Sequence, residues 1–467
     1  MPQAMPGEDV LYLSVRELAE RIRARTLSPV ELTEAYLERS RTIGAKLNAY
    51  VMLTPELARA EARQAEAEIA GGLYRGMLHG IPYAAKDLLA VRGYPTTWGA
   101  RMFADRKFDY DATVIQKLRD AGAILIGKAA MIELAGGMNY RFASASITGA
   151  TRNPWNTECW TCGSSSGSGA IAAAGLAGFA IGTETWGSII CPAAFCGASG
   201  LRPTFGRVSR HGAMALAFSM DKIGPLGRGA DDCGIVLSAI AGHDPADSAS
   251  LPDGAFSYND AAPAPLRIGW LTNAWKNPPA AVDAAVNEVR RVMSDAGAQI
   301  EPAALPEGPW EVAAGVVVSV EGASAFGDLI DSGKVSQLTD PLGRIGGYVN
   351  QQIPASDYVR AQRVRGILQR KIDTLFERFD VLAAASQPVT ATPLSTNLET
   401  GLDYADPLGG IGNFCGLPSI SVPCGFVNGL PVGAQFVGRV YDDLKVIAAA
   451  RLFQQHTDWH RRRPAVA

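Results

Sequence analysis

Short apolar runs that alternate with helical segments most strongly limit how this chain can fold. The run 123–127 directly follows a predicted helix over 112–121 and is typical of a buried strand. Weaker strand candidates lie at 180–182 and 383–385, and a further strand is predicted at 266–270. Strands and helices in alternation are typical of an α/β sheet covered on both faces. The sequence therefore predicts the α/β class.

The first 72 residues carry helix signals. Ser14 and Glu17 have the spacing of a capping box. Ser28 followed by Pro29 gives a second helix start, because proline suits the first helical position. A third helix is predicted over 55–69, ending at a pair of glycines. Together these segments predict an N-terminal helical cap over 10–72.

Charge and histidine content exclude several classes of function. The 43 Lys and Arg against 46 Asp and Glu give a net charge of −3, which provides no general attraction for nucleic acid. Five histidines argue against a multi-histidine metal centre, and we expect neither a metal nor a cofactor. Residues 252–265 could separate two domains, but we interpret them as a surface loop of one large domain.

The N-terminus and the cysteines bear on the compartment. Residues 1–10 lack the pattern of a secretory signal, and the mild apolar stretch 169–182 is too short to span a bilayer. Seven cysteines, an odd number, fit reduced thiols better than a disulfide framework. We therefore expect a cytoplasmic protein that does not contact a membrane. Five cysteines are expected to be small buried hydrophobic residues: Cys191, Cys196, Cys233, Cys415 and Cys424.

The Ser/Gly segment 162–169 is the most unusual part of the sequence, and an Ala-rich helical run over 170–174 follows it. A loop that leads into a helix start presents hydroxyls and free N–H groups together, which suits an anion or a developing oxyanion. A flexible linker is the other interpretation, and the helix that follows argues against it. A second loop, 182–189, places Ser188 after a glycine and could equally be an ordinary turn.

Lys86 ends the apolar stretch 80–86. Such a lysine is usually the solvated end of a strand. If it is buried, its pKa falls because desolvation disfavours the ammonium form, and it can then act as a base. The neighbouring Asp87 could orient Lys86 or simply begin a turn.

Two motifs point to other chemistries. Residues 163–167 match the G-x-S-x-G nucleophile elbow of α/β-hydrolases, which also needs an acid and a histidine. The histidines downstream are His211, His243, His456 and His460. Cys159 and Cys162 form a lone C-x-x-C without the second ligand pair of a zinc site or a thioredoxin-like context. We give both motifs little weight.

Taken together, the segments resemble the amidase signature family of serine hydrolases over about 28–450. The matching segments are 80–82 leading to 86–87, 113–128, 151–155, the Ser/Gly loop, 192–197, 201–209, 221–225 and 416–423. The resemblance implies one large domain over 1–467 with a mixed central β-sheet and helices on both faces. Its core motifs lie at about 80–245 and 380–450, and a variable substrate-shaping region lies at about 301–379.

The resemblance also implies a Ser–cis-Ser–Lys triad. Ser188 corresponds to the nucleophile, Ser164 to the bridging serine whose peptide bond is cis, and Lys86 to the base. Ser165 corresponds to a supporting serine. The oxyanion hole would use the backbone N–H groups of Thr185, Trp186, Gly187 and Ser188.

Several residues depart from the family pattern. Trp186 stands where a glycine is usual, Glu184 where aspartate is usual, and Ile190 where arginine is usual. Cys162 and Ser166 each replace a glycine of the Ser/Gly loop. The missing arginine removes a cation near the nucleophile and argues against small acidic substrates. The three triad side chains are all present.

These features predict a hydrolase that cleaves the C–N bond of a small apolar or aryl amide, with esters or carbamates as related substrates. Its partner would be the small-molecule substrate, and the chain a monomer or homodimer. The pocket residues would be Gly136, Gly137, Met138, Trp186, Ile190 and Phe195.

The second hypothesis is the amidase subunit of a tRNA-dependent glutamine amidotransferase, which passes ammonia to a partner; residues 184, 186 and 190 depart from that subgroup. A third, a binding protein on an inactive hydrolase fold, is disfavoured by the intact triad.

Overall fold

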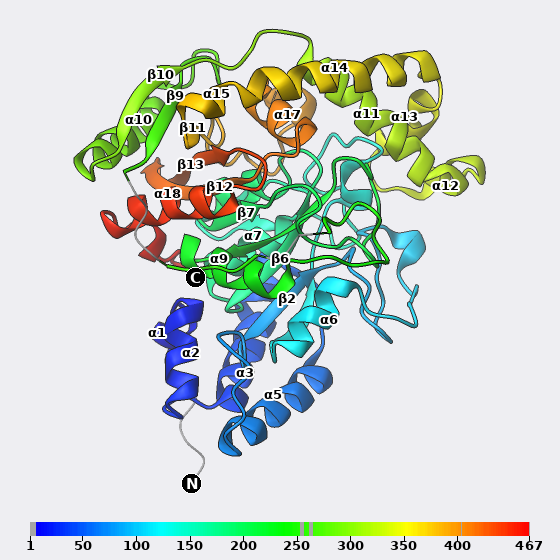
Figure 1. Cartoon of the computed structure of the whole chain (residues 1–467). Helices are drawn as coiled ribbons and strands as arrows, with labels where there is room; N and C mark the ends of the chain where they lie inside the picture. The colour runs from blue at the N-terminus through cyan, green and yellow to red at the C-terminus, as the bar shows by residue number, and fades with distance from the viewer. Residues whose placement is uncertain (1–5, 253–255, 261–264, 403, 467) are drawn as a thin grey trace.

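One mixed β-sheet runs through the computed structural model, which describes residues 6–252, 256–260, 265–402 and 404–466 (Figure 1). Within those ranges its eleven strands are, in spatial order, β1 (Tyr50–Leu53), β3 (Ile124–Ala129), β2 (Pro82–Lys86), β6 (Phe179–Glu184), β8 (Lys222–Gly227), β7 (Ser199–Arg202), β12 (Ser419–Val427), β13 (Leu430–Gly438), β11 (Val381–Ala385), β9 (Arg267–Leu271) and β10 (Gln299–Ala303). Strands β3, β2 and β6 are parallel neighbours, as are β11, β9 and β10, and the other neighbouring pairs are antiparallel. The predicted α/β class and mixed sheet are confirmed. A separate antiparallel pair consists of β4 (Arg152–Asn153) and β5 (Asn156–Trp160).

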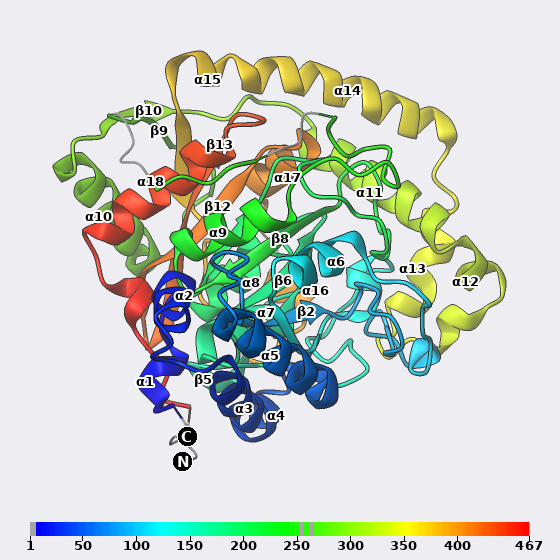
Figure 2. The ribbon, with the colours of Figure 1, turned by 60° about the horizontal axis from the view of Figure 1, so that its bottom comes forward.

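Helices cover both faces of this sheet. Those of the first half are α1 (Glu8–Leu11), α2 (Val15–Arg23), α3 (Pro29–Arg39), η1 (Ser40–Gly44), α4 (Ala45–Leu47), α5 (Pro55–Ala70), η2 (Arg101–Phe103), α6 (Thr113–Asp120), η3 (Glu133–Gly136), α7 (Ser166–Ala174), α8 (Ile190–Cys196) and α9 (Ala230–Ile240). Those of the second half are α10 (Ala280–Asp295), α11 (Trp310–Ala325), α12 (Gly327–Asp331), η4 (Lys334–Gln337), α13 (Gly343–Asn350), α14 (Ala355–Asp373), α15 (Leu375–Arg378), α16 (Leu398–Gly401), α17 (Pro407–Phe414), α18 (Asp443–Gln455) and η5 (Trp459–Arg461). Helices α7 and α8 pack on each other, and α9 packs on α18. In Figure 2 the long α14 crosses the top of the molecule, opposite α3 and α5.

The predicted helix starts near the N-terminus are confirmed. Ser14 and Glu17 form both hydrogen bonds of the capping box at α2. The Ser28 side chain accepts from two backbone N–H groups of α3, in which Pro29 is the first residue. Strand β1 was not predicted; it lies inside the predicted helical segment and pairs with β3 at the sheet edge. A run of only four residues carries too weak a periodic signal to be recognised.

The predicted strands are also confirmed, since they fall on β3, β6, β9 and β11. Of the predicted link over 252–265, residues 253–255 and 261–264 lie outside the described residues. In the part of the chain that the structure describes, every helix is too short or too polar to cross a bilayer.

Candidate active site

Lys86 is the last residue of β2, and its side chain is fully buried. Its Nζ donates hydrogen bonds to Ser164 Oγ at 2.7 Å, Ser165 Oγ at 2.9 Å and Thr183 Oγ1 at 2.9 Å. Burial lowers the pKa of Lys86 to about 7, although two nearby carboxylates oppose the shift. A lysine with this pKa is partly neutral at neutral pH and can accept a proton. Lys86 is therefore a buried lysine with a lowered pKa rather than the solvated end of a strand.

The Ser/Gly loop is a buried part of the core rather than a linker. The Gly163–Ser164 peptide bond is cis, as the resemblance implies. Ser165 Oγ donates to the Thr183 carbonyl at 3.1 Å and accepts from the Thr183 N–H at 3.2 Å, which attaches the loop to β6. Ser165 is the central serine of the apparent nucleophile elbow. Among the described residues, its hydroxyl bonds to Lys86 and Thr183 rather than to a histidine.

The loop that carries Ser188 connects β6 to α8. The Ser165 N–H donates to the Ser188 carbonyl at 3.3 Å, so this loop and the Ser/Gly loop lie side by side. Gly187 has φ of 77°, a left-handed conformation that glycine adopts without strain. The side chain of Ser188 is nearly buried, whereas residues 185–187 are partly exposed. The site therefore opens to solvent at this loop.

Sheet topology explains why these segments meet. Strands β2 and β6 are parallel neighbours, and Lys86 and Glu184 are their last residues. The carboxyl ends of parallel strands lie at the same edge of a sheet, where α/β proteins commonly form their sites. Lys86 and the loop that carries Ser188 therefore lie at one edge of the sheet.

Glu184 holds the loop that carries Ser188 in place. Its Oε2 accepts hydrogen bonds from the N–H groups of Ile189 at 2.8 Å and Ile190 at 3.0 Å. Its Oε1 accepts from Arg202 Nη1 at 2.7 Å and Asn413 Nδ2 at 2.9 Å. Burial alone would raise the pKa of Glu184, but the Arg202 charge and these hydrogen bonds lower it to about 2. The sequence analysis identified Glu184 only as a departure from the family pattern.

Two side chains of the loop are attached to distant segments. Thr185 Oγ1 donates to Asp221 Oδ1 at 2.5 Å. Trp186 Nε1 donates to Asp406 Oδ2 at 2.9 Å, across 220 positions of sequence. Nothing in the sequence indicated Asp406. The backbone N–H groups of Thr185 to Ser188 remain the proposed oxyanion donors.

The residues predicted to line a pocket lie in different surroundings. Met138, Ile190 and Phe195 are almost completely buried, and Trp186 is partly exposed. A Cβ at Gly137 would meet Leu216, and one at Gly136 would meet Tyr140, so both glycines lie close to side chains. A cavity of about 180 Å³ lies beside the loop that carries Ser188. None of the predicted pocket residues lines it; its lining includes Leu88, Thr183, Thr185, Met214, Leu216 and Asp221.

Asp87 does not contact Lys86 through its carboxylate. Its Oδ1 lies 2.9 Å from Lys128 Nζ in a fully buried ion pair, and its Oδ2 accepts from the Thr97 N–H at 3.0 Å. Asp87 therefore connects β2 to β3 and to the segment that follows β2.

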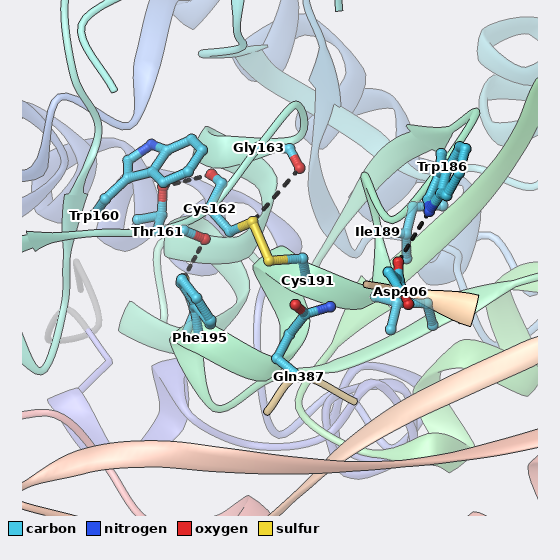
Figure 3. Close-up of a disulfide and its surroundings, with 12 residues drawn as sticks. Trp160, Thr161, Cys162, Gly163, Trp186, Ile189, Cys191, Phe195, Gln387 and Asp406 are labelled. Carbon is cyan, nitrogen blue, oxygen red and sulfur yellow. Dashed lines mark hydrogen bonds between the residues drawn. A yellow bond between two sulfur atoms is a disulfide. The ribbon is translucent and has the colours of Figure 1, made fainter. Parts of the chain in front are cut away.

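Cys162 and Cys191 form a disulfide, with 5.9 Å between their Cα atoms (Figure 3). The prediction of reduced thiols was wrong for this pair. Cys191 lies 29 residues after Cys162 and is brought near it by β6. The C-x-x-C motif, which contains only Cys159 and Cys162, therefore gave no indication of this disulfide. The bond joins the Ser/Gly loop to α8. The remaining described cysteines are free, as predicted. They are also buried, which was predicted for each of them except Cys159: Cys159, Cys196, Cys233, Cys415 and Cys424.

Comparisons with known proteins extend over nearly the whole chain. A family model described as Amidase matches residues 31–447. One glutamyl-tRNA(Gln) amidotransferase subunit, from Moorella thermoacetica, is 37% identical over 98% of this chain and 99% of its own length. The peptide amidase of Stenotrophomonas maltophilia is 31% identical with a TM-score of 0.85, covering 97% of this chain and 98% of that one. A bacterial aryl acylamidase is 25% identical with a TM-score of 0.85, covering 96% and 98%.

Proposed function

The chain belongs to the amidase family, and we propose that it hydrolyses an amide C–N bond with Ser188 as nucleophile, Ser164 as proton bridge and Lys86 as base. The observation that carries this proposal is the 2.7 Å hydrogen bond from Lys86 Nζ to Ser164 Oγ, where burial lowers the pKa of Lys86 to about 7. The contact between Ser165 and Ser188 supports the placing of the nucleophile beside this pair.

Acylation begins with neutral Lys86. As Ser188 Oγ attacks the amide carbonyl carbon, its proton passes to Ser164 Oγ while the Ser164 proton passes to Lys86 Nζ. The carbonyl oxygen becomes an oxyanion that the N–H groups of residues 185–188 stabilise, each well-placed donor contributing about 2.7–4 kcal/mol. The C–N bond then breaks, and the proton returns along the same path to the leaving nitrogen.

Deacylation repeats the steps with water. A water molecule attacks the acyl carbon of the Ser188 ester while its proton moves to the Ser164–Lys86 pair. The tetrahedral intermediate collapses, Ser188 Oγ leaves and is protonated again, and the carboxylic acid is released. The free enzyme recovers its starting protonation state.

Labelling with a fluorophosphonate tests this assignment without knowledge of the substrate. We expect the probe to attach to Ser188, identified by peptide mass spectrometry, and Ser188→Ala to abolish labelling. Lys86→Ala should reduce the labelling rate at least 100-fold. Ser336→Ala, at an exposed serine in η4, serves as the control and should label normally. A folded wild-type protein that is not labelled at Ser188 would refute the proposal.

The biological setting is a separate question, and the curated relatives favour the second hypothesis of the sequence analysis. The Moorella thermoacetica relative belongs to a glutamyl-tRNA(Gln) amidotransferase and is 37% identical over nearly full length. In that setting the chain would act with partner subunits on glutamine. The independent amidase is supported by the peptide amidase similarity and by Trp186 and Ile190, which make the surroundings of Ser188 more apolar.

Ammonia release distinguishes the two settings. The purified chain is assayed with glutamine and with aryl and alkyl amides, first alone and then with the remaining subunits of a bacterial glutamyl-tRNA(Gln) amidotransferase. Glutamine hydrolysis that rises only when those subunits are present supports the amidotransferase. Hydrolysis of apolar amides by the chain alone, unchanged by the subunits, supports the independent amidase.

A further inference from the structure

Trp186 links the nucleophile loop to a helix that lies far away in sequence. Its side chain leaves the loop two residues before Ser188 and extends to the start of α17 (Figure 3). The indole N–H donates to Asp406 Oδ2 at 2.9 Å. A Cβ at Gly410 would lie only 3.0 Å from Trp186 Cζ2, so the ring rests directly on the helix backbone. Glycine at this position leaves the space that the ring needs.

Asp406 is itself held on several sides. Its Oδ1 accepts from the Gly409 N–H at 2.9 Å, and its Oδ2 accepts from the indole. Its own N–H donates to Glu311 Oε1 at 2.7 Å, which connects it to α11. Burial raises the pKa of Asp406 to about 6, against the effect of the indole and Gly409 hydrogen bonds. Both carboxylate oxygens thus have partners, and Trp186 is attached to a supported group.

The remaining loop contacts show what this attachment does. Thr185 is bonded to Asp221 on one side, and Glu184 holds the N–H groups of residues 189 and 190 on the other. After Trp186, the Gly187 carbonyl accepts from the Cys191 N–H at 2.8 Å, which fixes the peptide unit between Gly187 and Ser188. Trp186 lies between the two preceding peptide units, which carry the N–H groups of residues 186 and 187, and its side chain is held at Asp406.

We propose that Asp406 is a positioning residue for the oxyanion donors: by holding the Trp186 indole against α17, it fixes the orientation of the backbone N–H groups of residues 186 and 187. Oxyanion donors must lie about 2.7–3.1 Å from the developing charge. A displacement of about 1 Å can cost about 100-fold in rate. The inference rests on the proposed serine hydrolysis, because it assigns a supporting residue to that mechanism.

The test measures fluorophosphonate inactivation as separate kinact and KI values. Trp186→Phe keeps a ring on Gly410 and removes the indole N–H, and Asp406→Asn keeps the size of the side chain. We expect each to lower kinact at least tenfold with KI within twofold of the wild type. Asp406→Asn leaves one acceptor oxygen for two donors, the Gly409 N–H and the indole N–H. Because both variants disrupt the same contact, the double variant should be no slower than the slower single variant.

The matched control is Trp155→Phe, which removes an equivalent indole hydrogen bond, 2.7 Å to the Cys196 carbonyl at the far end of α8. Its kinact should equal that of the wild type. If Asp406→Asn does not fold, Trp186→Phe alone decides the question. Wild-type labelling at Ser188 together with an unchanged kinact in Trp186→Phe overturns the inference and leaves the proposed function intact. Absence of wild-type labelling refutes the proposed function instead.

Discussion

The buried position of Lys86 predicts a specific pH dependence. With a pKa of about 7, the fraction of neutral Lys86 is about 9% at pH 6, about 50% at pH 7 and about 90% at pH 8. A lysine with the ordinary pKa of 10.5 would be only about 0.03% neutral at pH 7, so burial increases the reactive form by roughly 1,500-fold. The rate should therefore rise about tenfold per pH unit well below pH 7, about fivefold between pH 6 and pH 7, and level off above about pH 8.

The assay is the second-order rate constant kinact/KI for a fluorophosphonate from pH 5.5 to pH 9.5. Asp221→Asn supplies a second measurement, because the negative charge of Asp221 raises the pKa of Lys86. Removing that charge should move the midpoint to lower pH. Lys86→Arg should be inactive throughout, because a guanidinium stays protonated. A rate that still rises tenfold per unit above pH 9 would refute the assignment of a depressed pKa to the base.

Three predictions concern stability. Glu184→Gln should destabilise the fold by about 3–5 kcal/mol, measured by urea unfolding, because it leaves buried Arg202 without its charge partner. The ionised Glu184 carboxylate should also contribute about 3 kcal/mol to the free energy of unfolding, because its folded-state pKa is lowered to about 2. This contribution is fully present above pH 4.5 and is lost as the pH falls toward 2. The Glu184→Gln variant should not show this acid-dependent loss of stability. Replacing Cys162 and Cys191 by serine should lower the free energy of unfolding by about 3–4 kcal/mol, because the disulfide closes a loop of 29 residues in the unfolded chain. Reducing the disulfide of the wild type should lower its Tm by a similar amount. If neither the double serine variant nor the reduced wild type had a lower Tm, the entropy argument would be wrong.

Features with local signals were predictable from the sequence. The capping box at Ser14 and the proline after Ser28 mark helix starts within four residues, and the structure has helices at both places. The strand at β3 follows from an apolar run behind a helix. Such signals depend only on neighbouring residues, so tertiary packing did not change them.

Features that depend on distant partners were not predictable. Asp406 and Asp221 became visible only when folding brought them to the nucleophile loop. The disulfide was missed for the same reason, since Cys162 and Cys191 meet because Ser165 and β6 bring their loops together. An acidic or thiol side chain gives no sign in the sequence of which distant residue it contacts.

Trp186 shows how this limit affects the interpretation of a substitution. A bulky residue in place of a glycine suggests, from the sequence alone, a disturbed oxyanion hole. The structure provides room for the ring at Gly410 and an acceptor for its N–H at Asp406, so the three residues form one unit. Their effects on rate should therefore be non-additive, because residues in contact share one interaction. Replacing Trp186 by glycine alone would leave Asp406 Oδ2 without its indole donor and the space beside Gly410 unfilled.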